Sequence, residues 1–162
     1  MSTPRALANQ KLYCAKILIA SWGEALAKEQ IASTVLEQAF GQAVRDHLAA
    51  AYGWFLLEVA QPDQVPAAPP RNCSDLPAVA EGCETPPEIR EFQQLEREPW
   101  LAQILTAVEN QTPGHIEAAL WTTSPDNLAT VQGPGFTPQR AEQVHRRLNE
   151  LFQRMTDSLD EY

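Results

Sequence analysis

An arginine and a histidine separated by four residues are the feature of this sequence with the clearest chemical potential. They are Arg140 and His145, in the string Arg140-Ala-Glu-Gln-Val-His145. A histidine exchanges a proton near neutral pH, and an arginine binds phosphate oxygens through its planar fork of N–H donors. The pair therefore offers a proton carrier and a phosphate ligand, the two groups that cleavage of a phosphodiester backbone needs.

The same spacing resembles the motif of HEPN-type ribonucleases, which are compact helical bundles. The resemblance implies that an arginine and a histidine from two subunits meet across a dimer and act on RNA. The string His47-Leu-Ala-Ala-Ala-Tyr52-Gly-Trp54-Phe55 is also similar to the second helix of that fold. Ala141 departs from the pattern, because many such enzymes carry a polar residue there, and a net charge of −9 repels a phosphate backbone. A HEPN-like ribonuclease, or an inactive relative, is therefore the alternative hypothesis rather than the main one.

Two other titratable residues fall on an apolar helical face. His47 follows Val44 by three residues, so we expect a histidine that packs in the core. Glu58 lies three turns further on, too far to touch His47, and a buried carboxylate there needs a donor from another helix or loop. The sequence contains no glycine-rich phosphate loop, no Ser-His-acid pattern and no metal-ligand pair. We assign no catalytic, cofactor-binding or metal-binding residue.

The three cysteines predict free thiols. Cys14 lies in a helical stretch, and Cys73 and Cys83 flank a proline-rich stretch. An odd count without a secretory signal is typical of reduced cysteines, and nine intervening residues are too many for a paired metal site. A bridge between Cys73 and Cys83 remains the open alternative.

Four stretches carry apolar residues at the three- and four-residue spacing of amphipathic helices. The first covers about residues 6–30. The second starts at the capping box Thr34-Val-Leu-Glu37 and continues to about Ala60. The third begins at Thr85-Pro86-Pro87-Glu88, is kinked at Glu98-Pro99 and ends near residue 109, and the fourth opens at Thr137-Pro138.

These helices predict an all-α fold, an antiparallel four-helix bundle in a single domain over residues 1–162. Two long connections follow helices two and three. Residues 61–84 read as a proline-rich linker, and residues 110–136 read as a long loop that Trp121 pins against the bundle. No alternating pattern typical of strands is present.

The composition of the chain argues against a secreted protein and against a membrane protein. The amino-terminal residues contain no apolar run of signal-peptide length, and no stretch approaches the ~20 residues that cross a bilayer, so we expect a cytoplasmic protein without a membrane segment. We expect no cofactor and no nucleic-acid partner. The main hypothesis is a non-enzymatic protein that contacts another protein, with a homodimer as an option. The candidate surfaces are the loop around Trp121 and the basic strip of the last helix, which holds Arg140, Arg146, Arg147 and Arg154 beside His145.

Several residue strings resemble a family of small helical proteins of unknown function from Pseudomonas and related gammaproteobacteria. The strings are Asn9-Gln10-Lys11-Leu12-Tyr13 followed by Trp22, and Leu95-Glu96 followed by Pro99-Trp100-Leu101-Ala102. The resemblance spans most of the chain and implies a cytoplasmic helical protein. It supplies no catalytic residue.

Overall fold

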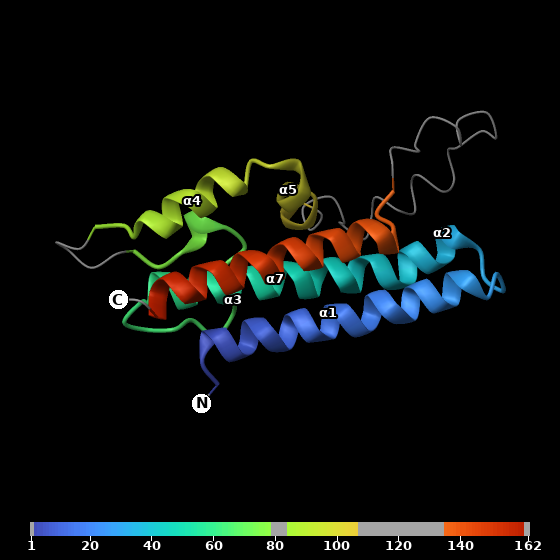
Figure 1. Ribbon diagram of the computed structural model, residues 1–162, viewed down its shortest axis with the longest axis horizontal. Helices are drawn as coiled ribbons and strands as arrows, with labels where there is room; N and C mark the ends of the chain where they lie inside the picture. The colour runs from blue at the N-terminus through green and yellow to red at the C-terminus, as the bar shows by residue number, and fades with distance from the viewer. Residues whose placement is uncertain (1, 79–83, 107–134, 161–162) are drawn as a thin grey trace.

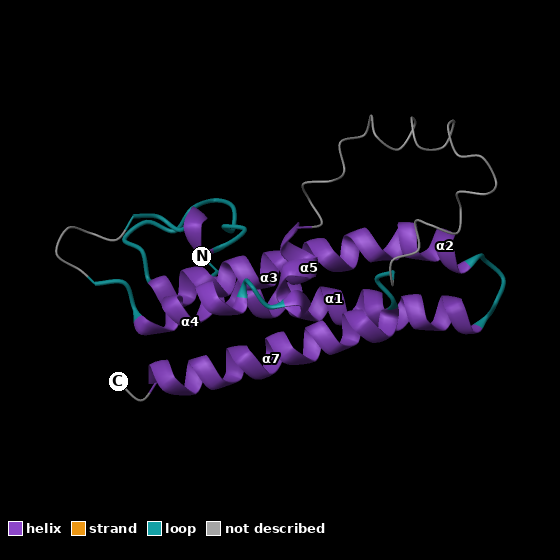
Figure 2. Cartoon of the chain, turned by 90° about the horizontal axis from the view of Figure 1, so that it is seen from above, coloured by secondary structure: helices purple, strands orange, loops and turns teal. Residues whose placement is uncertain are grey.

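The computed structural model describes residues 2–78, 84–106 and 135–160, and this part of the chain is entirely helices and connecting loops. Figure 1 shows three long helices, α1, α3 and α7, side by side, with the short helices α4 and α5 along one side. Figure 2, coloured by secondary structure, shows no strand among the described residues. The prediction of an all-α fold is confirmed.

Helix α1 covers Pro4–Ala27, close to the predicted 6–30. The Thr3 hydroxyl accepts the backbone N–H of Ala6 at 3.2 Å, and a proline at the first position needs no hydrogen-bond acceptor. The helix ends before Glu29, whose φ of 51° is the left-handed conformation common after a helix. Its inner face buries the predicted stripe, namely Ala8, Leu12, Ala15, Ile19 and Trp22.

The second predicted helix is a rod in three parts. It consists of α2 over Ser33–Leu36, a π-helical turn over Glu37–Gly41, and α3 over Gln42–Ala60. The predicted capping box is wrong, because α2 starts after Ala32 without a side-chain cap. The Glu37 carboxylate instead accepts the N–H of Phe136 at 3.1 Å. A contact across 99 residues thus replaces a local one.

Helix α3 is the centre of the fold. It contacts α1, α4, α5 and α7, and residues 51–57 are buried without exception. The Phe55 ring stacks on Phe152 of α7 at 4.0 Å between centroids and meets Phe92 of α4 edge-on at 6.1 Å. The core therefore gathers around the carboxyl-terminal half of α3.

Residues 85–106, the described part of the third predicted helix, do not form the kinked helix that we expected. Two separate helices occupy the described part, α4 over Pro87–Leu95 and α5 over Pro99–Leu105. Glu98 between them is extended, with ψ at 134°, because the residue before a proline avoids the helical region. The four-helix bundle with a kinked third helix is therefore not confirmed.

Helix α7 covers Pro138–Asp160 and begins as predicted. The Thr137 hydroxyl accepts the N–H of Arg140 at 3.3 Å. Its buried stripe faces α1 and α3.

The linker 61–84 is more ordered in part than predicted. Gln61 takes the left-handed conformation and ends α3, and Cys73–Asp75 form a 3-10 turn capped by the Asn72 side chain. Most of the 110–136 loop, Trp121 included, lies outside the described residues. Its final residue, Phe136, is buried against Trp22 at a centroid distance of 6.2 Å.

Candidate functional site

A cluster of polar groups joins α3, the 73–75 turn and the end of α4. The Glu96 carboxylate oxygen Oε1 accepts the Tyr52 hydroxyl at 2.8 Å and the backbone N–H of Cys73 at 2.7 Å. The Cys73 Sγ atom lies 3.9 Å from the Tyr52 hydroxyl oxygen and 3.9 Å from the Ile89 carbonyl oxygen. Tyr52 is fully buried and Cys73 nearly so.

The surroundings of this cluster keep the Cys73 thiol and the Tyr52 hydroxyl protonated. Burial raises the pKa of the Cys73 thiol to about 12, and the Glu96 carboxylate adds to the effect. Burial likewise raises the pKa of Tyr52 above its ordinary value, with further contributions from Cys73 and Glu96. The thiolate is the nucleophilic form of cysteine, so Cys73 is chemically inert at neutral pH. The cluster holds three segments together and is not a reactive centre.

A pocket of about 470 Å³ opens beside Cys73, between the end of α3 and the start of α4. Prolines and aliphatic side chains form part of its wall, and the exposed carboxylates of Asp63 and Glu84 line it as well. Among the described residues of its wall, no nucleophile has an adjacent base. Cys73 is a free thiol, and Cys83, its alternative bridging partner, lies outside the described residues.

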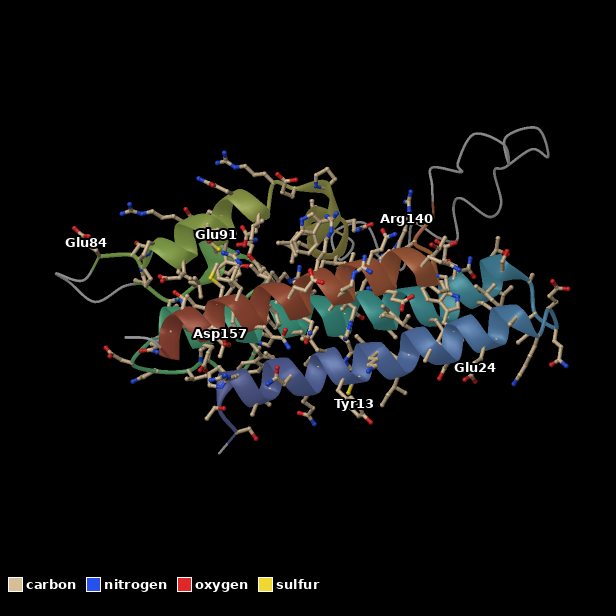
Figure 3. The ribbon with its side chains drawn as sticks, viewed as in Figure 1. Tyr13, Glu24, Glu84, Glu91, Arg140 and Asp157 are labelled. Atoms are coloured by element: carbon tan, nitrogen blue, oxygen red, sulfur yellow. The ribbon has the colours of Figure 1, made fainter. Side chains whose placement is uncertain are left out.

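Arg140 and His145 do not come together within one chain. His145 lies in a hollow of about 350 Å³ between α1 and α7, together with Lys16 and Glu142. Arg140, labelled in Figure 3, lines a different hollow of about 300 Å³ beside α5. Five residues along a helix turn the side chain by about 140°, which explains the separation.

The His145 ring is tied to α1. Its Nε2 atom lies 3.1 Å from the Leu12 carbonyl oxygen, and because a carbonyl only accepts, Nε2 carries the proton. Burial lowers the pKa of His145 below its usual value, and Lys16 lowers it further, although the bond to Leu12 opposes both. The imidazole therefore acts as a structural link between α1 and α7.

The basic strip of α7 is partly engaged within the chain. Arg154 forms a two-bonded ion pair with Glu91 of α4, and the Arg147 guanidinium lies 5.5 Å from the centre of the Trp100 ring. An ion pair thus joins α4 to the last helix at Arg154.

The two titratable residues of α3 have separate surroundings. The Glu58 carboxylate accepts the N–H of Arg5 at 3.2 Å, so its donor comes from another helix, as expected. This bond occupies one of the free N–H groups at the start of α1. His47 is half-buried rather than in the core, and burial lowers its pKa, with Lys11 contributing.

The outer face of α1 is the feature that sequence reasoning missed. A second stripe runs along this helix at alternating steps of four and three residues, on the side opposite the buried stripe. All of its members are exposed, namely Ala6, Gln10, Tyr13, Ile17, Ala20, Glu24 and Ala27. Tyr13 is 64% exposed and Ile17 is 48% exposed, one turn apart. We call these seven residues the outer stripe of α1.

The sequence contains a signal for the outer stripe. Helix α1 carries apolar residues on more than the one face that the core covers, whereas a surface helix normally has a polar outer side. Figure 3 shows Tyr13 on the side of α1 away from α3 and α7, with Glu24 further along the helix. No described element covers this side in Figure 1.

Membrane-spanning helices and metal-ion clusters are two kinds of site that the described residues lack. None of the helices in this part of the chain has the length and apolar character needed to cross a membrane. The same residues contain no group of three or more His, Cys, Asp or Glu side chains arranged to hold a metal ion.

Comparison with curated proteins and with solved structures finds no match to this chain. Comparison with protein families does find one, and the match spans residues 1–162. It agrees with the resemblance carried by the strings around Tyr13 and Trp100. The chain belongs to DUF6586, a family of unknown function.

Proposed function

We propose that this protein is not an enzyme and acts by binding another protein through the outer stripe of α1. The observation that carries the proposal is the exposure of Tyr13 and Ile17 at the centre of that stripe. Steps of four and three residues are the spacing with which one helix packs against another. The partner surface is therefore helical.

The rest of the molecule supports this role as a scaffold. We propose an antiparallel four-helix bundle in which α4 and α5 together take the third position, since α1, α3, α4 and α7 run in alternating directions in Figure 1. A cytoplasmic location belongs to the proposal and is supported by the free thiols of Cys14 and Cys73.

No observation favours the ribonuclease alternative. Arg140 and His145 line different hollows, and His145 is bonded to the Leu12 carbonyl. The buried thiol of Cys73 is protonated at neutral pH. Contact with a partner is the function that these side chains support best.

Site-specific photocrosslinking in the native cell tests the proposal. A photoreactive phenylalanine analogue replaces Ile17 in the full-length chain, and the matched control carries the same analogue at Asn149, an exposed position on α7. We expect a discrete protein adduct from position 17 and none from position 149. Adding Tyr13→Ser should reduce the adduct without changing the circular dichroism spectrum, since Tyr13 is exposed.

Two results would refute the proposal. One is the lack of any adduct at position 17, and the other is an adduct of equal yield at position 149. The first would mean that the outer stripe does not contact a protein in the cell, and the second that the contact is not specific to the stripe.

A further inference from the structure

We infer that the partner on the outer stripe of α1 is a second copy of this chain, with the two α1 helices antiparallel about a two-fold axis near residue 15. The inference rests on the proposed function and names its partner. Three properties of the stripe carry it: its register, the distribution of its side chains, and its charge.

The register of the stripe is self-complementary. The stripe advances along α1 in alternating steps of three and four residues. In an antiparallel pair of helices, each residue reached by a four-residue step faces a residue reached by a three-residue step on the other helix. Around residue 15 this places Tyr13 opposite Ile17 of the second copy, Gln10 opposite Ala20, and Ala6 opposite Glu24. The two-fold axis repeats each contact with the roles of the two copies exchanged, as in an isologous dimer.

The side chains are arranged as in a contact surface. The two large apolar residues, Tyr13 and Ile17, lie at the centre of the stripe, next to the axis. The polar residues Gln10 and Glu24 lie toward its ends. Interfaces commonly have an apolar centre and a polar rim, and aromatic anchors contribute most of their binding energy.

Charge favours a second copy meeting the first at this face. Residues 1–60 carry five basic and five acidic side chains, so the whole net charge of −9 belongs to the remainder of the chain. Figures 1 and 3 show α4, which includes the acidic residues Glu88 and Glu91, on the far side of α3 and α7 from α1. Helix α1 itself carries three basic side chains and one acidic one, so two copies joined through α1 meet at a helix without the acidic excess of the rest of the chain and keep their α4 helices apart.

The contact is small, so the dimer is weak. The stripe from Ala6 to Glu24 extends about 27 Å at 1.5 Å per residue. One helix pair of this length falls below the roughly 1,600 Å² of a standard interface. We expect a dissociation constant on the order of micromolar.

Sedimentation equilibrium of the full-length chain at increasing concentration tests the inference. We expect the wild-type chain to pass from monomer to dimer. Ile17→Glu should raise the dissociation constant at least about tenfold, because it places a charge in the apolar centre. Val65→Glu is the matched control, since Val65 is 51% exposed and lies outside α1; it should dimerise as the wild type does.

A double variant tests the direction of the pairing. Tyr13→Glu with Ile17→Lys places opposite charges across the antiparallel interface and like charges across a parallel one. We expect it to dimerise more tightly than either single variant, and weaker dimerisation than both would overturn the antiparallel register.

Two further results would overturn the inference. They are a wild-type chain that stays monomeric at every concentration and a dimer that Ile17→Glu leaves intact. If the chain is monomeric but position 17 crosslinks to a different protein in the cell, the proposed function stands and the second copy is wrong. If position 17 also gives no adduct, both fail.

Discussion

The carboxylate of Glu96 holds together parts of the chain that lie far apart in sequence. One of its oxygens accepts both the Tyr52 hydroxyl and the Cys73 N–H. Hydrogen bonds to a charged acceptor contribute more than neutral ones, and a buried hydroxyl without a partner is costly. The proton on Cys73 is part of this arrangement, because deprotonation would place a thiolate beside the carboxylate.

This arrangement predicts a loss of stability at alkaline pH. The folded state binds the Cys73 proton more tightly than the unfolded state does, because the pKa rises from about 9 to about 12 on folding. The stabilising contribution of Cys73 is therefore complete below about pH 9 and is lost as the pH rises toward 12. We expect the urea-unfolding free energy to fall more steeply between pH 8 and pH 11 for the wild type than for Cys73→Ala.

The comparison of the wild type with Cys73→Ala includes an internal control. Every other titrating group is common to the two proteins, so the difference between their unfolding free energies reports the Cys73 proton together with its effect on Tyr52. This difference should shrink as the pH rises, and a difference that stays constant from pH 8 to pH 11 would contradict the prediction.

At the scale of the elements, one glycine decides how the linker crosses α3. A Cβ atom added to Gly53 would collide with the Pro70 carbonyl oxygen and would lie 2.9 Å from the Pro69 Cβ. The backbone after α3 therefore passes directly over this glycine. Proline at both positions restricts the crossing segment to an extended conformation.

The two helical glycines of α1 and α3 should respond oppositely to alanine. Gly53→Ala should destabilise the fold by about 1–3 kcal/mol, because the gain in helix propensity is smaller than the cost of moving the linker. Gly23→Ala is the matched control in α1, where an added Cβ meets nothing within 4 Å. It should stabilise the fold by up to about 1 kcal/mol. Urea denaturation measures both, and equal effects would show that the linker does not rest on Gly53.

The local sequence predicted where helices begin and end better than it predicted whether two helical stretches join into one helix. The start of α7 and the break at Pro99 were predictable from a proline, and the spacing of apolar residues placed the start of α1 within two residues. The separation of α4 from α5 was not predictable, because a proline fixes where the chain leaves the helix and not the direction in which it continues.

On the scale of the whole molecule, charge is divided unevenly between the two parts of the sequence. The first 60 residues are neutral and the remainder carries the net −9. At low ionic strength the Debye length reaches about 30 Å, so the acidic parts of two copies repel each other even when they do not touch.

This division predicts that salt strengthens the proposed dimer. Raising NaCl from 10 to 150 mM should lower the dissociation constant by about threefold, because screening removes the long-range repulsion. Above 150 mM the value should change little, since the contact itself is apolar. Sedimentation at several salt concentrations measures this dependence, and a dimer that weakens as salt is added would point to ion pairs in place of the outer stripe.

The sequence by itself determined the helical class, the inner stripes of α1 and α7, and the start of α7 at Thr137-Pro138, because each depends on residues within a turn or two of one another. Only the tertiary structure decided which donors the Glu37 and Glu96 carboxylates accept, and that Arg140 and His145 face different hollows. It also decided that the outer stripe of α1 remains uncovered by the described residues. Periodicity gives the faces of a helix, but which face is buried depends on helices brought together from distant parts of the chain.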